Sequence, residues 1–203
     1  MPRPFSEEER AAIRATLLEQ GRRLFAAQGL RKTSVEELTA AAGISKGAFY
    51  LFFGSKEELF FELLERYEAR YKADLLELAA RDTLPPRERM RALLERSLAL
   101  MRSEPLFSRV GRAEYDLLLR RLPPERVAAH LRGDDDFAER FAAAWAAAGA
   151  PLALPPPTVA GLIRALFFVS LHEEEFSPGR YEEVIGELTA LVAARLVPEE
   201  GAR

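Results

Sequence analysis

The spacing of hydrophobic residues predicts helices along the whole 203-residue chain. Over residues 13–25 apolar side chains recur at intervals of three and four, as on one face of an α-helix, and a similar stripe covers residues 59–71. No run alternates polar and β-branched apolar residues, and the prolines fall between the apolar segments. The pattern therefore predicts an all-α protein.

Polar residues at the segment ends predict where the helices begin and end. Ser6, Ser34 and Ser55 each precede a glutamate by three residues, a spacing typical of a reciprocal N-terminal cap. Gly29 and Gly43 follow the first two helices at positions that favour a left-handed stop. About nine helices are expected. A helix is expected over residues 56–80, and two more begin near residues 85 and 105. The last three are expected over residues 123–149, 159–176 and 181–197.

The segment "GISKGAFYLFFGSK", residues 43–56, predicts a helix-turn-helix. A short helix over about residues 35–42 stops at Gly43, and Ser45 can cap a second helix that runs to about Phe53.

A helical wheel divides this second helix into two sides. Phe49, Phe52 and Phe53 fall together on one side, which we expect to be buried. The other side is formed by Lys46, Gly47, Tyr50 and Leu51. In a helix-turn-helix the second helix enters the DNA major groove, so this sparse side is the candidate reading surface.

Charge and composition support a DNA-binding head. The chain has a net charge of −3, but residues 20–56 carry six basic residues against two glutamates. A basic lobe on an acidic body suits phosphate binding. The chain has no cysteine, which excludes disulfides and thiol catalysis. The beginning of the sequence lacks a secretory signal, and the most apolar run, residues 158–171, is shorter than the roughly 20 residues of a membrane span. We therefore expect a cytoplasmic protein without a membrane partner.

Residues 33–64 resemble the DNA-binding head of the TetR family of transcriptional regulators. The resemblance rests on Thr33, the Gly43-Ile44-Ser45 turn, Tyr50 with Phe53, and the Ser55-Lys56-Glu57 run. It implies a helix-turn-helix DNA-binding domain over residues 1–54 and a helical effector-binding and dimerisation domain over residues 55–203. The implied function is that of a homodimeric repressor, released from a palindromic operator by a small, mostly hydrophobic effector. Two positions depart from the family pattern: Phe52 replaces a frequent tyrosine or histidine, and Gly54 replaces a common proline.

The resemblance and the helical stripes together assign candidate residues to three surfaces. The candidate DNA contacts, of which the two serines are also helix caps, are Thr33, Ser34, Ser45, Lys46, Gly47, Ala48, Tyr50 and Lys56. The candidate effector pocket comprises the aromatic and polar residues Phe107, Arg112, Glu114, Tyr115, Phe137, Phe141, Trp145, Phe167 and His172. The candidate dimer interface lies on the last two helices, at Leu162, Leu166, Phe168, Val169, Val184, Leu188, Leu191 and Val192.

Other functional classes fit the residues less well. With two histidines, no cysteine and no glycine-rich phosphate loop, we expect neither an enzyme nor a bound cofactor. His130 and Asp134 have a spacing that could hold a metal, but an exposed acidic helix edge explains them better, and no metal site is predicted. The alternative is a helical dimerising or adaptor protein without sequence-specific DNA binding. It accounts for the last two helices but not for the basic cluster from Lys46 to Lys56.

Overall fold

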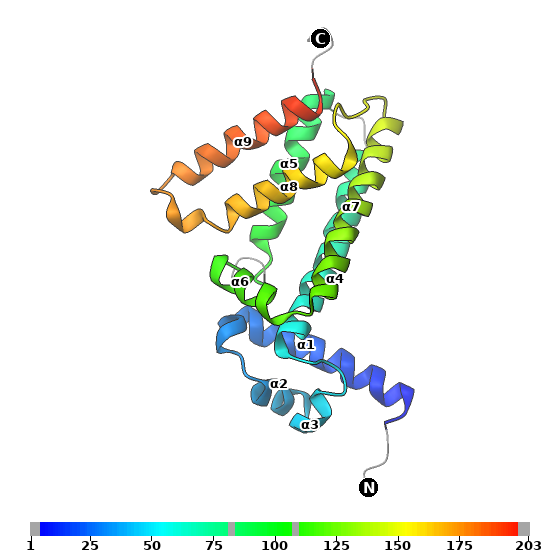
Figure 1. Ribbon diagram of the computed structural model, residues 1–203, viewed down its shortest axis with the longest axis vertical. Helices are drawn as coiled ribbons and strands as arrows, with labels where there is room; N and C mark the ends of the chain where they lie inside the picture. Colours follow the sequence, from blue (N-terminus) through cyan, green and yellow to red (C-terminus); the bar gives the residue numbers. More distant parts are fainter. Residues whose placement is uncertain (1–4, 81–83, 107–109, 199–203) are drawn as a thin grey trace. The chain divides into compact units, whose positions relative to one another are not determined.

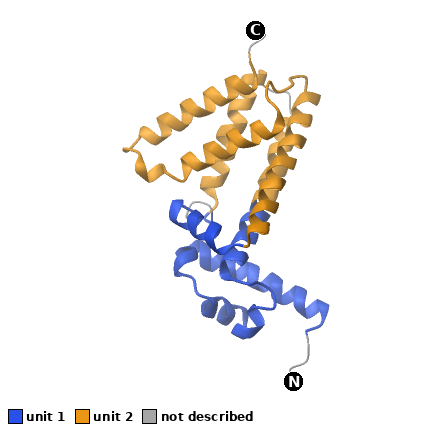
Figure 2. Cartoon of the chain, viewed as in Figure 1, with its two compact units in different colours: residues 1–67, 105–122 blue, residues 68–104, 123–203 orange. Residues whose placement is uncertain are grey.

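The computed structural model describes residues 5–80, 84–106 and 110–198, and these residues form nine α-helices and no strand (Figure 1). The all-α prediction is confirmed. The chain divides into two compact units (Figure 2). Unit 1 comprises residues 1–67 and 105–122, and unit 2 comprises residues 68–104 and 123–203. The division after residue 54 concerns function and stays a prediction, since α4 runs unbroken from Lys56 to Ala79 and contributes to both compact units.

Unit 1 contains the helix-turn-helix. Its helices are α1 (Glu7–Lys32), α2 (Val35–Ala42), α3 (Lys46–Phe49), the first part of α4 (Lys56–Ala79) and α6 (Arg112–Arg121). α1 packs against α2, and α2 packs against α3.

The helix ends of unit 1 follow the predicted signals. Ser6 and Ser34 each form a complete capping box with the glutamate three residues later. Gly29, with φ of 81°, breaks α1 one turn before its end, and Gly43, with φ of 68°, ends α2. At Ser55 only half of the box is present: its hydroxyl accepts a hydrogen bond from Glu58 N, but the Glu58 carboxylate bonds elsewhere.

The core of unit 1 joins α1 to α4. The rings of Phe25 and Phe60 meet edge to face with centroids 5.0 Å apart. Gly21 lies buried on the α1 stripe, and a Cβ atom there would meet Leu59 Cδ2 at 3.0 Å. The Leu59 side chain of α4 is therefore the close neighbour of Gly21. This packing fixes the position of α4 relative to α1 within the unit.

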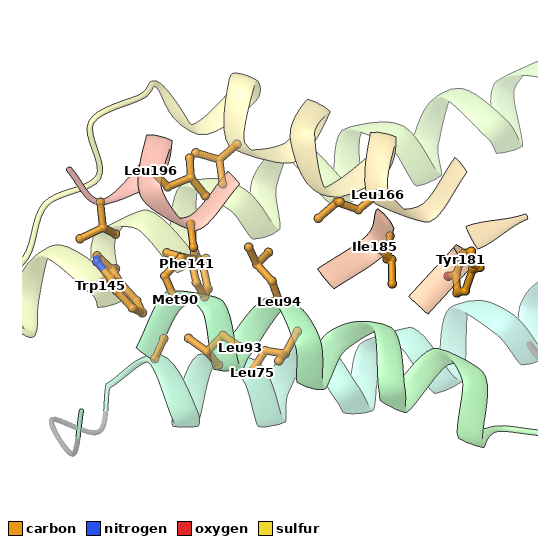
Figure 3. Close-up of a cluster of buried hydrophobic side chains, with 14 residues drawn as sticks. Leu75, Met90, Leu93, Leu94, Phe141, Trp145, Leu166, Tyr181, Ile185 and Leu196 are labelled. Atoms are coloured by element: carbon orange, nitrogen blue, oxygen red, sulfur yellow. The ribbon is translucent and has the colours of Figure 1, made fainter. Parts of the chain in front are cut away.

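Unit 2 is built around a second core. Its helices are the second part of α4, α5 (Pro86–Ser103), α7 (Pro124–Ala147), α8 (Pro156–Ser170) and α9 (Arg180–Leu196), with a short 3-10 turn η2 (Glu173–Glu175). α5 packs against α9, and α7 packs against α8. Figure 3 shows the side chains that these helices bury together, from Trp145 and Leu196 at one end to Ile185 and Tyr181 at the other.

Two of the predicted helices after α5 differ from the observed ones. The helix expected from residue 105 begins at Arg112, after Gly111 in extended conformation. The helix expected over residues 159–176 runs from Pro156 to Ser170 instead, and η2 follows it as a separate turn. Proline at the first turn explains the earlier start of α8, because its fixed φ suits that position.

Among the residues that the structure describes, none of the helices has both the length and the apolar character that crossing a membrane requires.

Candidate nucleic-acid interface

The turn between α2 and α3 spans Gly43 to Ser45. Gly43 N donates to Ala40 O at 3.3 Å, and Ile44 N donates to Thr39 O at 3.0 Å, which closes the end of α2. Ser45 then caps α3, its hydroxyl accepting from Ala48 N at 3.1 Å. The local sequence therefore builds the predicted helix-turn-helix.

α3 is shorter than the sequence predicted, because its α-helical part ends at Phe49 rather than near Phe53. Leu51 N donates to Ala48 O at 3.1 Å, and Phe52 N donates to Phe49 O at 2.9 Å. These are bonds of the tighter i to i+3 type, which are common in the last turn of a helix. Because the chain keeps turning in the same sense, the two sides predicted from the helical wheel are preserved.

The phenylalanine side of this segment anchors it. Phe49 is fully buried and Phe53 is 4% exposed, as predicted. Phe52 is only partly buried, and its ring centroid lies 6.2 Å from that of Phe5 and 5.4 Å from the guanidinium of Arg10. The departure from the family pattern at this position thus places an aromatic ring against the start of α1.

The opposite side of the segment is open. Tyr50 and Leu51 are 51% and 58% exposed, and a Cβ atom on Gly47 would meet no described atom closer than 3.9 Å. The Tyr50 ring stands edge to face against Phe49, with centroids 5.4 Å apart. Ala48 is partly buried. The surface therefore presents backbone and a phenol, supported from behind by a buried ring.

Lys46 supplies the positive charge of this surface. Its ammonium donates to the Glu36 carboxylate on α2, and both side chains are more than half exposed. This hydrogen bond raises the pKa of Lys46 and lowers the pKa of Glu36. Lys46 is therefore charged at neutral pH, and a phosphate or a base edge has to compete with Glu36 for it.

Three other predicted DNA contacts also have internal partners. Thr33 is 1% exposed, and its hydroxyl donates to Gly29 O at 2.8 Å. The Ser34 hydroxyl accepts from Glu37 N and donates to the Glu37 carboxylate. Lys56 donates to backbone carbonyls of unit 1. Ser45, Lys46, Gly47 and Tyr50 are thus exposed together on α3 and its ends, whereas Thr33, Ser34 and Lys56 bond to other residues of unit 1.

Gly54 forms a hydrogen bond that was not predicted from the sequence. Gly54 N donates to Glu58 Oε2 at 3.1 Å, and a Cβ atom on Gly54 would meet Glu58 Oε1 at 2.8 Å. Proline has no N–H to donate, so this hydrogen bond requires a different residue there. The sequence signal was the glutamate four residues later, which the capping pattern had assigned to Ser55.

The predicted effector residues fall into both units. Arg112, Glu114 and Tyr115 lie on α6 in unit 1, and Phe107 lies outside the described residues. In unit 2 the aromatic residues of α7 form a continuous row: the rings of Phe137 and Phe141 are 6.1 Å apart, and those of Phe141 and Trp145 are 5.8 Å apart. The remaining two candidate residues, Phe167 and His172, also belong to unit 2. Phe167 is partly buried, and His172 Nδ1 lies 2.9 Å from Glu175 Oε1.

Trp145 and Phe141 are core residues of unit 2, with 0% and 5% of their surface exposed. Trp145 Nε1 is buried and has no hydrogen-bond partner among the described residues. Their assignment to an effector pocket stays a prediction.

The candidate dimer residues are divided between core and surface. Leu166 is 4% exposed and belongs to the core of unit 2. Phe168 on α8 and Leu191 on α9 are 40% and 64% exposed. The others are partly buried. Of these, four pack against that core, namely Leu162, Val169, Leu188 and Val192, and the fifth is Val184.

A cluster of ionisable groups lies between α4, α7 and α8 in unit 2. Oxygen and nitrogen atoms of Glu68, His130 and Asp134 lie within 4.8 Å of one another, a spacing that a metal ion could use. Lys72 Nζ already lies 2.7 Å from Asp134 Oδ1 and 3.4 Å from Glu68 Oε2, and Arg164 lies 3.4 Å from Asp134 Oδ2. Because an ammonium and a guanidinium balance these carboxylates, the cluster needs no metal to neutralise it. Burial raises the pKa of Glu68.

Comparison with known proteins identifies the same region. Residues 17–63 match the family model of bacterial regulatory proteins of the tetR family. An HTH-type transcriptional repressor of Mycobacterium tuberculosis, Rv1474c, is 34% identical over 150 residues, which cover 73% of this chain and 64% of that protein. Three other curated regulators match over shorter stretches, and the chain spans 24%, 41% and 16% of their lengths, less than half in each case.

Solved structures share the fold beyond the matched head. A TetR-family transcriptional regulator from Pectobacterium atrosepticum superposes with a TM-score of 0.71 and 25% identity, over 95% of this chain and 98% of that one. The complex of SmeT with triclosan gives a TM-score of 0.57 at 22% identity, with 93% of each chain covered. SmeT is the repressor of a multidrug efflux pump of Stenotrophomonas maltophilia. At 22% identity this second likeness concerns the fold.

Proposed function

The chain belongs to the TetR family of transcriptional regulators, which are not enzymes, and from that premise we propose that it is a homodimeric repressor with a palindromic operator. In this proposal a small, mostly hydrophobic effector releases the protein from DNA. Such a repressor acts in the cytoplasm, where the chromosome lies.

The observation that carries the DNA-binding part is the division of α3 and the turn after it into two sides. Phe49 is fully buried, while Tyr50, one residue later, is 51% exposed beside the exposed Gly47 and Lys46. A buried anchor holds the segment in one orientation, and the lack of a side chain at Gly47 lets the backbone approach the groove. In this proposal Lys46 donates to guanine or phosphate oxygens, and Tyr50 donates to a phosphate oxygen.

Binding as a dimer follows from the size of this surface. One α3 carries too few side chains to select a sequence, so two copies on half-sites about 34 Å apart, or a multiple of that, are needed. We assign the dimer contact to α8 and α9. Phe168 and Leu191 are exposed apolar side chains there, and a Cβ atom added to Gly161 or Gly186 would meet no described atom within 4 Å. Open glycines allow a second pair of helices to approach closely, and the exposed apolar residues gain from burial.

The effector part of the proposal rests on the family and on the shared fold. The related SmeT structure holds triclosan, a small hydrophobic molecule. We assign the effector to unit 2, where the aromatic row of Phe137, Phe141 and Trp145 supplies apolar surface. An effector that drives the protein from 99% to 1% binding-competent must bind the two states with affinities that differ about 10⁴-fold.

A binding selection from random duplex DNA tests the proposal. The enriched sequence is expected to be a palindrome. The affinity of the protein for this DNA should fall steeply as the salt concentration rises, because the protein contacts several phosphates. Lys46→Ala and Tyr50→Phe should each weaken binding to this operator while leaving the melting temperature unchanged. Titration with hydrophobic small molecules, beginning with triclosan, then tests release.

The alternative of a helical dimerising or adaptor protein makes the opposite prediction. Such a protein would enrich no sequence, and Lys46→Ala would not change its partner binding. If the purified dimer binds a selected palindrome no better than random DNA at moderate salt, the repressor proposal is wrong.

A further inference from the structure

Lys56 is the first residue of α4, and its ammonium is fully engaged within unit 1. Nζ lies 2.6 Å from Thr33 O, 2.8 Å from Leu30 O and 3.3 Å from Arg31 O. An ammonium has three N–H donors and no acceptor. Each of the three donors therefore has a backbone carbonyl within reach, and the side chain is partly buried where they meet.

These carbonyls need an external donor. They follow Gly29, whose positive φ of 81° interrupts the α1 hydrogen-bond pattern. Carbonyls in the last turn of a helix have no partner within the helix, and a cation is favourable there because it also complements the helix dipole. Leu30 and Thr33 are each 1% exposed, so water has little access to replace Lys56 at this junction.

The same junction is held from α2. The Thr33 hydroxyl donates to Gly29 O at 2.8 Å, and Ser34 N donates to the Glu37 carboxylate at 2.8 Å. Gln28 Nε2, one residue before the break, donates to Glu37 Oε1 at 3.1 Å. The end of α1, the start of α2 and the first residue of α4 are thus joined through one short network.

We propose that Lys56 is a positioning residue of the DNA-binding unit, which fixes the α1–α2 junction to the first turn of α4 through backbone carbonyls and makes no phosphate contact. The proposal rests on the proposed DNA-binding function. It assigns two lysines of the same unit to different tasks: Lys46 is on the exposed surface, and Lys56 sets the direction in which α2 and α3 present that surface.

Two measurements on Lys56→Met distinguish positioning from phosphate contact, with Lys46→Met as the matched reference. The methionine keeps most of the apolar stem and removes all three donors. In the DNA-free protein, amide exchange over residues 30–37 is expected to accelerate in Lys56→Met and to stay unchanged in Lys46→Met. Operator affinity of Lys56→Met should fall at least about tenfold, as when hydrogen bonds to a charged group are lost.

Salt dependence supplies the second measurement. Each phosphate contact contributes about 0.9 to the slope of log affinity against log salt. Lys46→Met should lower the magnitude of the slope by about that amount per copy, whereas Lys56→Met should leave it unchanged. Lys56→Arg, which keeps the charge but has a planar fork, should give intermediate exchange rates.

Either of two results would contradict a positioning role for Lys56. A lower slope in Lys56→Met, or exchange rates over residues 30–37 equal to those of the unchanged protein, overturns the positioning assignment. If Lys56→Met does not fold, amide exchange in Lys56→Arg decides, because exchange rates over residues 30–37 equal to those of the unchanged protein would again overturn the assignment. If the unchanged protein selects no operator, the proposed function fails, and the exchange experiment without DNA still tests the network.

Discussion

Replacing Phe49 by alanine tests the division of the α3 segment into a buried and an exposed side. Phe49 is fully buried and contacts the rings of Tyr50 and Phe53, with centroids 5.4 and 6.0 Å away. Burying such a side chain contributes about 1.5–3 kcal/mol, and the cavity left behind raises the cost of Phe→Ala to about 3–5 kcal/mol. A typical domain has only about 5–15 kcal/mol of stability, so a large part of it would be lost.

Leu51→Ala is the matched control, because it truncates a large apolar side chain two residues away that is 58% exposed. A change within about 0.5 kcal/mol is expected there. Urea unfolding should be followed by far-UV circular dichroism, which reports all helices, and by tryptophan fluorescence. The chain has one tryptophan, Trp145 in the core of unit 2. Phe49→Ala should therefore shift the dichroism transition more than the fluorescence transition.

Equal losses of stability in Phe49→Ala and Leu51→Ala would contradict the division of this segment into a buried and an exposed side. Equal losses would mean that the two side chains have similar surroundings, and the exposed surface assigned to DNA would then be misplaced.

Three further predictions concern other parts of the chain. Glu36→Gln should raise the affinity for random duplex DNA about two- to fivefold in fluorescence anisotropy, because Lys46 loses its internal partner; an unchanged affinity would show that Lys46 is not used. Glu68 has a pKa raised by burial, so its carboxylate destabilises the fold as pH rises through that pKa. Glu68→Gln should then raise the melting temperature at pH 7.5, with the gain shrinking towards pH 4; a loss at every pH would mean that the ion pairs dominate. Leu191→Asp should convert the dimer to monomer in sedimentation at micromolar concentration, whereas Leu131→Asp on α7 should not, and a dimer that persists in the first variant excludes α9 from the interface.

The sequence predicted those features that depend on neighbouring residues. The capping boxes at Ser6 and Ser34 and the left-handed glycines at Gly29 and Gly43 involve partners within five positions, and all are observed. The burial of Phe49 followed from helical periodicity, which survives although α3 is four residues shorter than expected. Short-range chemistry was therefore sufficient to place the helix-turn-helix.

Features that depend on the tertiary fold were not predictable in this way. The partners of Lys56 are carbonyls more than 20 residues earlier in the chain. The residues around Lys56 in the sequence would look the same if its side chain were exposed to solvent. Pairing of Lys46 with Glu36 likewise requires the angle between α2 and α3, which the hydrophobic pattern does not give. For the aromatic residues of α7 the same periodicity predicts a core or a pocket wall, since both present apolar side chains at helical spacing.

The contact between Gly54 and Glu58 has a consequence for the evolution of this family. The Gly54 amide donates to the Glu58 carboxylate, and a Cβ atom on residue 54 would meet Glu58 Oε1 at 2.8 Å, so the Glu58 side chain would have to move away from it. A relative with proline at the first position has no N–H to donate to this carboxylate, so this hydrogen bond no longer favours a glutamate four residues later. The two positions are therefore expected to covary among homologues, with glycine paired with glutamate and proline paired with smaller or uncharged residues.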